Sequence, residues 1–507
     1  MMYNGREIKK IVCGVFMSWT KEDLQNLVRK ELSDRLLIVV ANREPYIHVV
    51  SGKDSIECTV PASGLTVALD PVMRACGGVW VAHGSGSADK LVVDEKNRVK
   101  VPPDEPSYTL RRVWLTKEEE EGYYLGFSNE ALWPLCHIAY TPPNFDEADW
   151  KTYKRVNKLF AEAVLDEVAN QKAFIFIQDY HLALLPRFIK EKNPRVVTAQ
   201  FWHIPWPNPE VFRICPWGPE ILDGLLSNDL LGFHIRYHCY NFMDTIDRTL
   251  ESKIDHERWA INRGDKTTYI RAFPISVDFE RLSREGDSEQ VRKEMEIIQH
   301  NWKLEGEFVG IGADRLDYTK GIPHRLRALD KFFTKYPEYK GKLIFFQMGE
   351  PSRVHIKKYK ELNAEVDDLV EEINWKHQVG GWRPIVYIKR HCSATTLLAF
   401  NRLADFCIVS SLHDGMNLVA KEFVSSRVDE GGVLLLSPFT GAARELTQAL
   451  LVNPYATDEF ADAIKKAIEM PVKQRQTRMK KLRQIVAQNN IYMWASSIIT
   501  EVANLGI

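Results

Sequence analysis

The feature that most constrains this fold is a series of short apolar runs, each of which ends in polar or glycine-containing residues. The runs are nearly continuous and rich in β-branched residues, as expected for parallel strands that are buried on both faces. Helical patterns lie between many of them, for example at 151–168 and 458–469. This alternation of strands and helices predicts doubly wound α/β sheets. The runs are LLIVVANRE, FIFIQDYH, VVTAQFWHIPWP, DLLGFHI, FVGIGADRLDYTKG, KLIFFQMGEPSR, IVYIKRH, DFCIVSSLHDG, GVLLLSPFTG and ALLVNPY.

The number of runs and the chain length both indicate more than one domain. About ten strands are too many for one typical sheet, and a chain of 507 residues is long enough for two to four domains of about 150 residues. The segment 272–287 contains a proline and separates the two sets of strands, so it is the best linker candidate. We predict four parts: an N-terminal extension that is mainly helical (1–35), an N-terminal Rossmann-like domain (36–280), a C-terminal Rossmann-like domain (281–485) and a C-terminal helix (486–507). In the extension, Thr20 and Asp23 have the spacing of a helix capping box.

The bulk charge and the cysteines exclude several classes of partner. The net charge of −1 provides no general basic field for nucleic acid, so an anionic ligand must be bound by a local cluster of cations and amides. No apolar run approaches the roughly 18 residues of a membrane span, and the basic N-terminal stretch shows no signal-peptide cleavage site. The eight cysteines form no CxxC pair, which favours buried free thiols and a cytoplasmic protein. The oligomeric state stays open, with a homo-oligomer among the alternatives.

Polar clusters follow the apolar runs directly. In open α/β sheets, ligands bind beyond the carboxyl ends of the strands. Because these clusters come from both halves of the chain, the simplest arrangement has two Rossmann-like domains that face each other across a cleft. The clusters are Arg43, Asp179–His181, His203, Arg315–Lys320, Arg353, His391 and Asp414–Glu422.

Two of these clusters suit a nucleotide diphosphate. In GADRLDYTKG, the cations Arg315 and Lys320 follow a strand, although a solvated surface turn is an equally good local interpretation. In HDGMNLVAKE, Gly415 permits close backbone approach and the amides of 416–419 would bind phosphate at a helix N-terminus. Glu422, one turn further, could then accept hydrogen bonds from ribose hydroxyls. The competing interpretation is a core helix capped by an aspartate.

The remaining clusters point to sugars. His203 and Asp179 end strands in FWHIPWP and IQDYH, where they suit sugar hydroxyls better than a metal ion. Arg43 and Gly64 resemble a weak glycine-loop pattern without GxGxxG. YYLGFSNEALWP reads as an amphipathic helix that exposes an aromatic surface, which is either a sugar platform or core; its aromatic residues include Tyr124 and Trp133.

Taken together, the motifs resemble the trehalose-6-phosphate synthase family, the retaining glycosyltransferases of family 20. The likeness covers roughly residues 36–505 and is carried by FSNEALWP, QDYHLALLP, WHIPWPNPEVF, RLDYTKGIP, DGMNLVAKEFV and NPY in family order. It implies a GT-B fold without a catalytic metal or cofactor, because the nucleotide sugar is a substrate. It also implies a donor site in the second domain, an acceptor site in the first, and a last helix that crosses back to the first domain.

The resemblance also implies roles for individual residues. On the donor side, cations would bind the diphosphate, amides would cradle it, a carboxylate would bind ribose, and a histidine and an aspartate would contact the glucose. These donor-side residues are Arg315, Lys320, Met416, Asn417, Leu418, Val419, Gly415, Glu422, Gly64, His391, His203 and Asp414. On the acceptor side, two arginines would grip a 6-phosphate and four further residues would form the sugar pocket. The acceptor-side residues are Arg43, Arg353, Tyr124, Trp133, Asp179 and Tyr180.

The implied reaction is transfer of glucose from a nucleoside diphosphate glucose, expected to be UDP-glucose, to glucose 6-phosphate. The sequence departs from the family pattern at WVAHGSG, where His83 stands near the position of a family tryptophan, and at SSLH before Asp414. The first strand ends in NREPY, which is also reminiscent of glucosylglycerol-phosphate synthases. Alternatives are therefore a sibling enzyme that uses glycerol 3-phosphate or a cyclitol phosphate, a non-catalytic regulatory protein of the same fold, and a sugar-nucleotide epimerase. The donor base stays open.

Overall fold

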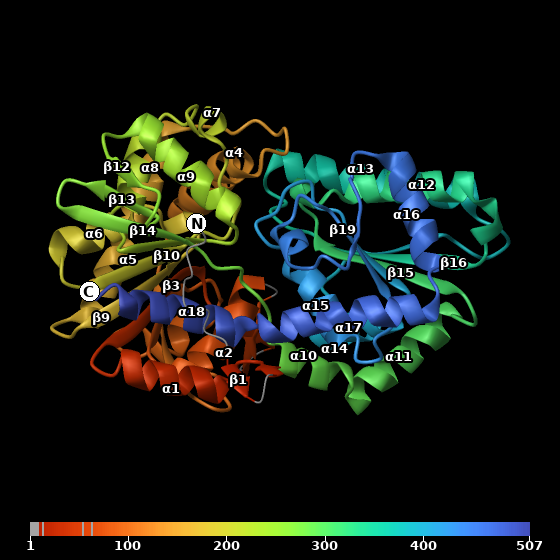
Figure 1. Ribbon diagram of the computed structural model, residues 1–507, viewed down its shortest axis with the longest axis horizontal. Coiled ribbons are helices and arrows are strands. Elements are labelled where there is room, and N and C mark those ends of the chain that lie inside the picture. The colour runs from red at the N-terminus through yellow and green to blue at the C-terminus, as the bar shows by residue number, and fades with distance from the viewer. Residues whose placement is uncertain (1–9, 13–14, 53–54, 62–63, 507) are drawn as a thin grey trace. The chain divides into compact units, whose positions relative to one another are not determined.

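The structure is a computed structural model that describes residues 10–12, 15–52, 55–61 and 64–506. The chain forms two compact units (Figure 1). Unit 1 comprises the residues up to Ile275 together with those from Ile491 onwards, and unit 2 comprises Ser276–Asn490. The chain therefore passes from one unit to the other twice, and unit 1 is built from two separate segments.

Unit 1 contains a ten-stranded sheet in the order β12-β13-β14-β11-β10-β9-β3-β6-β8-β7. The seven strands from β14 to β8 in this order run parallel, and β7, β12 and β13 add antiparallel edges. The central strands are almost wholly buried, which explains their continuous apolar sequences. The strands are β3 (Leu36–Arg43), β6 (Val79–His83), β7 (Arg98–Val101), β8 (Tyr108–Val113), β9 (Ala173–Gln178), β10 (Val197–Phe201), β11 (Leu230–Phe233), β12 (Lys253–Asp255), β13 (Ala260–Arg263) and β14 (Lys266–Ala272).

Helices connect these strands. One region departs from the α-helix that the sequence suggests, because Glu121–Leu132 forms a π-helical stretch between two short α-helices. The helices of unit 1 are α1 (Lys21–Glu31), α2 (Gly64–Cys76), α3 (Lys117–Glu120), α4 (Trp133–His137), α5 (Glu147–Val168), α6 (Leu185–Lys192), α7 (Pro209–Phe212), α8 (Gly218–Leu225), α9 (Arg236–Thr249) and α18 (Ile491–Asn504).

The N-terminal region is only partly helical. The capping box predicted for α1 is present, since the Asp23 amide donates to Thr20 Oγ1 over 3.2 Å and the Thr20 amide donates to Asp23 Oδ2 over 3.1 Å. Before this helix, β1 (Lys10–Val12) pairs with β2 (Val15–Met17) as antiparallel strands. A second antiparallel pair, β4 (Ile47–Ser51) and β5 (Ser55–Thr59), follows β3.

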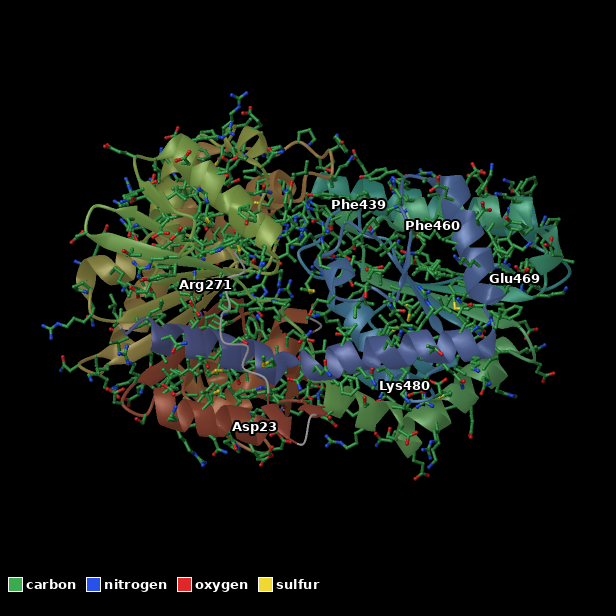
Figure 2. The ribbon with its side chains drawn as sticks, viewed as in Figure 1. Asp23, Arg271, Phe439, Phe460, Glu469 and Lys480 are labelled. Atoms are coloured by element: carbon green, nitrogen blue, oxygen red, sulfur yellow. The ribbon has the colours of Figure 1, made fainter. Side chains whose placement is uncertain are left out.

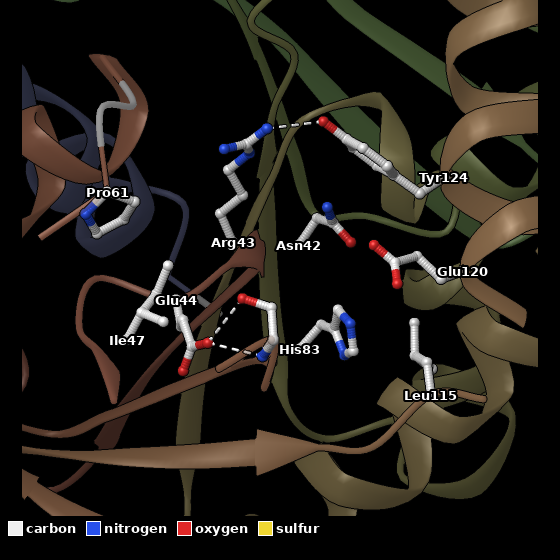
Figure 3. Close-up of a pocket in the computed structure, with 10 residues that line it drawn as sticks. Asn42, Arg43, Glu44, Ile47, Pro61, His83, Leu115, Glu120 and Tyr124 are labelled. Carbon is white, nitrogen blue, oxygen red and sulfur yellow. Dashed lines mark hydrogen bonds between the residues drawn. The ribbon is translucent and has the colours of Figure 1, made fainter. Parts of the chain in front are cut away.

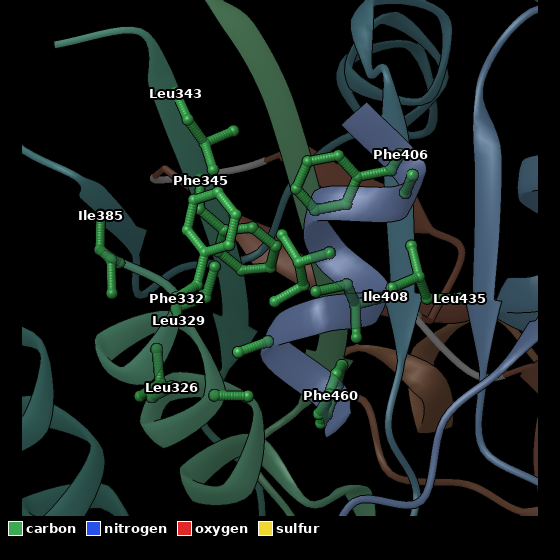
Figure 4. Close-up of a cluster of buried hydrophobic side chains, with 14 of the residues drawn as sticks. Leu326, Leu329, Phe332, Leu343, Phe345, Ile385, Phe406, Ile408, Leu435 and Phe460 are labelled. Carbon is green, nitrogen blue, oxygen red and sulfur yellow. The ribbon is translucent and has the colours of Figure 1, made fainter. Parts of the chain in front are cut away.

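Unit 2 contains a six-stranded, entirely parallel sheet in the order β17-β16-β15-β18-β19-β20. Aromatic and aliphatic side chains from its strands and helices form a continuous core, including Phe345, Phe406 and Leu326 (Figure 4). Phe460 of α16 is buried in this core, whereas Lys480 of α17 is exposed (Figure 2). The strands are β15 (Phe308–Arg315), β16 (Leu343–Glu350), β17 (Ile385–Ile388), β18 (Phe406–Val409), β19 (Val433–Leu436) and β20 (Leu450–Leu451). The helices are α10 (Phe279–Gly286), α11 (Glu289–Trp302), α12 (Ile322–Lys335), α13 (Lys357–His377), α14 (Ala394–Leu403), α15 (Leu418–Ser426), α16 (Thr457–Ile468) and α17 (Val472–Gln488).

The last helix, α18, packs within unit 1. Its Trp494 contacts Phe176 and Phe201, with ring centroids 5.7 and 5.1 Å apart. Glu501 accepts a hydrogen bond from Arg271 over 2.6 Å. Two Rossmann-like α/β units, as the alternation of strands and helices predicted, thus make up the chain.

The described cysteines and helices bear on two further expectations. Seven cysteines are free thiols, and Cys136, Cys215, Cys239 and Cys407 are buried, but Cys58 is exposed on β5, contrary to the prediction of burial. Within the described part of the chain, no helix combines the length and the apolar character needed to cross a membrane.

Candidate functional site

In unit 2, the carboxyl ends of the neighbouring parallel strands β15 and β18 bring two loops together. The Leu412 amide donates to the Thr319 carbonyl over 2.7 Å. Gly321 lies between the two loops with a φ of +64°, and a Cβ there would stand 2.2 Å from the Ser410 carbonyl oxygen. Only glycine fits this approach, which places Lys320 against the loop that follows β18.

Lys320 and Asp414, both predicted site residues, form an ion pair with 2.5 Å between Lys320 Nζ and Asp414 Oδ2. The same carboxylate oxygen accepts hydrogen bonds from Ser411 Oγ and Asn417 Nδ2, each over 3.1 Å. The carboxylate is therefore held in one orientation by three donors. Both members of the ion pair are largely buried, with 13% and 12% of their side chains exposed.

The helix that follows, α15, begins later than the sequence suggests. It starts at Leu418, and its N-cap is Asn417, whose side-chain oxygen accepts from the Ala420 amide over 3.3 Å. The competing interpretation of a core helix capped by an aspartate is wrong, because Asp414 lies in a bridge with Thr440 and binds Lys320. Asn417 has a φ of 72°, a conformation that asparagine tolerates better than most residues. The first-turn amides are those of Leu418 and Val419, which have no partner inside the helix.

Arg315 and Glu422 supply charge near these loops. Arg315 ends β15, is half-buried, and forms no ion pair with any residue that the structure describes. Glu422 lies in the second turn of α15 and is half-buried; burial raises the pKa of its carboxyl, and the charge of Arg281 only partly opposes this. Gly415 and Met416 link the ion pair to the helix, and Met416 is buried.

Arg353 is engaged within unit 2. Its guanidinium lies 3.2 Å from Asp317 Oδ2 and donates to the Tyr359 hydroxyl over 2.5 Å. Burial would raise the pKa of Asp317, but Arg353 and the nearby Lys320 and Arg315 lower it overall. Arg353 has a φ of 49° and a side chain only 5% exposed. It was predicted to grip an acceptor phosphate, and in this conformation its charge is compensated by Asp317.

The other predicted residue of unit 2, His391, is more loosely placed. It follows β17 on the surface, with its side chain 57% exposed and Nδ1 3.5 Å from Glu350 Oε2.

In unit 1, the structure brings several predicted acceptor residues into one line. Arg43 ends β3 and donates to the Tyr124 hydroxyl over 2.8 Å (Figure 3). The Tyr124 ring stacks on His181 at 5.7 Å, His181 contacts Tyr180 at 4.0 Å, and Tyr180 contacts Trp133 at 5.8 Å. His181, which the sequence placed in the polar cluster Asp179–His181 but not among the predicted acceptor residues, therefore joins the two ends. Trp133 is 6% exposed, so the prediction that it is exposed is wrong; the π-helical stretch turns it into the core.

Asp179 and His203 also meet. The Asp179 carboxylate accepts from the His203 amide over 3.2 Å, and His203 Nε2 lies 2.9 Å from Gln178 Oε1. Asp179 has φ 71° and ψ 176°, a region that is essentially reserved for glycine, and such strain clusters at functional sites. Burial, together with His181, lowers the pKa of His203 to about 3. His203 is therefore neutral at physiological pH and suits hydrogen bonding rather than proton transfer.

Gly64 is the exposed first residue of α2. Among the residues that the structure describes, no group of three or more His, Cys, Asp or Glu side chains is placed to hold a metal ion.

A pocket of about 170 Å³ opens at the ends of β3 and β6 (Figure 3). Only two of its lining residues, Arg43 and Tyr124, were predicted site residues. The others were missed because they come from separate strand ends, loops and a helix, and only the departure at WVAHGSG drew attention to His83. The lining residues are Asn42, Arg43, Glu44, Ile47, Pro61, His83, Ser85, Leu115, Glu120 and Tyr124.

A buried ion network supports this pocket from behind. Arg112, fully buried, donates from Nε to Glu44 Oε2 and pairs with Asp89 Oδ1, each over 2.8 Å. Burial raises the pKa of Glu44 to about 8, helped by its hydrogen bond with Asp89. Burial also acts to raise the pKa of Asp89, but the hydrogen bonds from Glu44 and from the His48 and Gly86 amides, with the charge of Arg112, lower it overall. At neutral pH the network thus contains one cation, one anion and one protonated carboxyl.

Comparisons with known proteins agree with this architecture. Residues 35–504 match the model of glycosyltransferase family 20. The UDP-forming alpha,alpha-trehalose-phosphate synthase of Schizosaccharomyces pombe is 31% identical over 498 residues, covering 96% of this chain and 94% of that protein. Enzyme A of the same name from Dictyostelium discoideum is 32% identical over 466 residues, covering 92% of this chain but only 62% of the longer relative.

Solved structures give the same result. A UDP-forming synthase from Burkholderia xenovorans in complex with glucose 6-phosphate has a TM-score of 0.82 and 29% identity, covering 92% of this chain and 99% of that chain. The Escherichia coli trehalose-6-phosphate protein bound with UDP-2-fluoro glucose has a TM-score of 0.82 and 30% identity, covering 92% and 98%.

Proposed function

Because the chain belongs to glycosyltransferase family 20, we propose that it transfers glucose from UDP-glucose to glucose 6-phosphate. The products are trehalose 6-phosphate and UDP, and the configuration at the donor carbon is retained. Relatives named UDP-forming trehalose-phosphate synthases cover most of the chain, and the solved relatives bind a UDP-glucose analogue and glucose 6-phosphate.

The observation that carries the proposal is the convergence of cations and helix amides in unit 2. Lys320 is fixed by Asp414, Arg315 supplies a charge that forms no ion pair with the described residues, and α15 presents its first-turn amides. A diphosphate is dianionic or more and is bound well by a helix N-terminus with nearby cations. Glu422, in the second turn, supports ribose binding because its carboxyl oxygens accept hydroxyl donors.

The chemistry requires stabilisation of the leaving diphosphate. The bond between glucose C1 and the diphosphate oxygen breaks, and the acceptor hydroxyl oxygen bonds to C1 on the same face. The proton of that hydroxyl passes to the departing diphosphate oxygen. The negative charge that develops on this oxygen is stabilised by Arg315, Lys320 and the α15 amides. Preorganised donors of this kind often make the largest contribution to catalysis.

The sugars are oriented by groups that do not exchange protons. His203 is neutral and, with Asp414, supports contacts to donor hydroxyls. Arg43 and the aromatic line from Tyr124 to Tyr180 support binding of the acceptor.

We further propose that the reaction needs no metal or cofactor, because protein cations and amides are available for the diphosphate charge. A cytoplasmic location is supported by the free thiols of the described cysteines. A homo-oligomer is a further part of the proposal, and light scattering measures the oligomeric state.

The proposal is tested by incubating the chain with UDP-, GDP- and ADP-glucose against glucose 6-phosphate, glycerol 3-phosphate and a cyclitol phosphate, with and without EDTA. Identification of trehalose 6-phosphate from UDP-glucose, unaffected by EDTA, is the expected result. If product forms only with glycerol 3-phosphate or the cyclitol phosphate, that compound is the acceptor in place of glucose 6-phosphate. If no combination of donor and acceptor gives product, the assignment as an enzyme is wrong.

A further inference from the structure

Four ionisable side chains lie buried behind the pocket at the ends of β3 and β6, and the proposed reaction uses none of them. They are Glu44, His48, Asp89 and Arg112. Only 1% of the Glu44 side chain is exposed and none of the Arg112 and Asp89 side chains, so a ligand in the pocket cannot reach them. Buried charges are costly unless they are paired and hydrogen-bonded, and in this cluster they satisfy one another.

The two carboxyls of the cluster share a proton. Glu44 and Asp89 form a hydrogen bond with each other, which two carboxyls can do only when one of them is protonated. Arg112 is the one cation among the four groups and lies 2.8 Å from each carboxyl. His48 adds no charge, because its Nδ1 lies 2.8 Å from the Arg112 guanidinium, which can only donate. One cation, one anion and the shared proton therefore balance the cluster.

The cluster holds the loop 84–88, which follows β6 and forms part of the pocket wall. Ser85 donates to Glu44 Oε1 twice, from its amide over 2.8 Å and from its hydroxyl over 3.1 Å (Figure 3). The Gly86 amide donates to Asp89 Oδ2 over 2.6 Å. Ser85 is exposed and lines the pocket, whereas the carboxyl that it contacts is buried. The two carboxyls thus fix the backbone of this loop to the end of β3.

Loss of the shared proton would leave two buried negative charges beside one cation. Ser85 would donate more strongly to an ionised Glu44, but repulsion from Asp89 and the lack of water oppose ionisation, and burial raises the pKa of Glu44 from 4.5 to about 8. Water reaches this carboxyl only if the loop moves. The closed loop is therefore favoured most at low pH and is disfavoured, by up to about tenfold per pH unit, as the pH rises to about 8.

Other titratable or charged groups face the cluster from the elements around it. All of them stay in place when Glu44 alone is replaced, so a substitution at this position isolates the effect of its proton. The groups are Arg43 on β3, Cys58 on β5, His83 at the end of β6 and Glu120 on α3.

We propose that Glu44 is a positioning residue for acceptor binding: the proton that it shares with Asp89 fixes the loop 84–88 to the end of β3, and loss of this proton releases the loop. Glu44 touches no substrate and acts through Ser85 on the wall of the pocket. The inference rests on the proposed function for what enters the pocket, but not for the state of the loop. The cluster of Lys320 and Asp414 contains none of these groups, so donor binding is unaffected.

The test compares the wild type with Glu44→Gln and Glu44→Leu. The glutamine amide has no proton to lose, yet it keeps one oxygen that accepts from Ser85 and an N–H2 group that donates to Asp89, whereas leucine has neither. Glu95→Gln is the matched control, because it changes an exposed carboxyl of unit 1 that forms no ion pair with the described residues. Kinetics with UDP-glucose and glucose 6-phosphate are measured at pH 7 and 9, where a phosphate monoester, with a second pKa of about 6, keeps its charge.

We expect the wild-type KM for glucose 6-phosphate to rise about 5–10-fold between pH 7 and 9, as closure becomes less favourable. In Glu44→Gln the rise falls to about 1–2-fold, and in Glu44→Leu the KM is high at both pH values. The pH dependence of kcat and of the KM for UDP-glucose is the same in all four proteins, and Glu95→Gln behaves as the wild type. A merely structural role would raise the KM of Glu44→Gln equally at both pH values and leave the rise unchanged.

Hydrogen exchange of residues 84–91, followed by mass spectrometry, reports the loop without any substrate. At pH 9 the Ser85 and Gly86 amides should exchange at least about 3-fold faster in the wild type than in Glu44→Gln, and at pH 7 at similar rates. An equal rise in KM, or equal exchange at pH 9, in the wild type and folded Glu44→Gln would overturn the inference. A wild-type KM that is the same at pH 7 and 9 would overturn it without any variant. Absence of transfer by the wild type would count against the proposed function instead, since hydrogen exchange still decides the state of the loop.

Discussion

Two groups of polar side chains at strand ends, one in each unit, differ in how completely they bind one another. In unit 2, Lys320, Asp414, Ser411 and Asn417 bind one another directly, so the cluster is already ordered. In unit 1, the buried ions around Arg112 also bind one another, but in the pocket in front of them the buried Asn42 Oδ1 has no hydrogen-bond donor among the described residues. The cluster of unit 2 holds its charged groups in position before any ligand binds, which suits a ligand that is common to a whole class of reactions. The pocket of unit 1 leaves a hydrogen bond unformed until one particular ligand completes it.

This difference separates catalysis from selectivity. A preformed charge cluster loses little order when a diphosphate binds, which is what stabilisation of developing charge requires. An incomplete hydrogen-bonding face penalises any ligand that cannot complete it, which is what discrimination requires. The following changes test whether the two functions are divided in this way.

The largest effect is expected from Arg112→Met, which should lower the free energy of unfolding by about 3–5 kcal/mol. Removing the arginine leaves Asp89 buried and ionised without its cation. Urea denaturation measures the change. The matched control is Arg213→Met, because the Arg213–Glu210 pair is 71% and 62% exposed and such pairs contribute about 1 kcal/mol or less. Equal effects of the two substitutions would contradict a structural role for the network.

Lys320→Ala should reduce kcat at least about 100-fold, by analogy with loss of one preorganised donor. Stability should change less than in Arg112→Met, since Ser411 and Asn417 still donate to Asp414 and this pair is 13% and 12% exposed, whereas Arg112 and Asp89 are fully buried. Steady-state kinetics with UDP-glucose and glucose 6-phosphate provide the measurement. Lys331→Ala, which removes a lysine that is 42% exposed and paired with Asp458, is the control. Turnover near the wild-type value would remove Lys320 from the catalytic group.

Glu44→Gln should change how stability depends on pH. The carboxyl has a pKa of about 8 in the folded protein against 4.5 ordinarily, so between these values the folded protein holds a proton that the unfolded chain has released. Raising the pH across this window therefore disfavours folding, by up to about 1.4 kcal/mol per pH unit. The neutral amide of the variant removes this contribution. Urea denaturation at pH 5, 6, 7 and 8 tests it, and parallel profiles for both proteins would show that Glu44 does not titrate there.

The smallest effect is expected from Glu422→Gln, with a KM for UDP-glucose about 3–10-fold higher and kcat nearly unchanged. The amide keeps one acceptor oxygen and replaces the other by an N–H2 group, which cannot accept a hydrogen bond from ribose. Calorimetric titration with UDP separates this from acceptor effects. UDP affinity equal to that of the wild type would place the ribose elsewhere.

The same contrast explains what the sequence could predict. The cluster of unit 2 lies in two contiguous stretches around Lys320 and Asp414, each at the end of an apolar run, so the pattern of strands and loops indicated both stretches. The pattern alone left a surface turn and a capped core helix as alternatives, and the family resemblance was needed to give the residues a role. The capping residue of α15 could not be predicted, because nothing in the sequence shows that Asp414 would bind Lys320 and leave the cap to Asn417. The ion pair between Arg353 and Asp317 likewise depends on how the chain packs, and no local sequence pattern predicts it.

The pocket of unit 1 was harder to predict. Asn42, Ser85 and Glu120 come from a strand end, a loop and a helix, and each looks ordinary in its own segment. The burial of Trp133 follows from the π-helical geometry of the preceding residues, which the apolar period of the sequence does not distinguish from an α-helix. Sequence patterns thus identify strand ends well, but they do not show which side chains from different ends share a space.

The return of the chain to unit 1 at Ile491 has a consequence for biosynthesis. A ribosome releases the strands of unit 1 long before it makes α18, and all of unit 2 is synthesised in between. Until then Phe176 and Phe201 lack the Trp494 ring that packs against them in the finished protein. Unit 1 is thus translated first and completed last. Until α18 is made, the nascent chain carries an uncovered apolar surface to which chaperones bind.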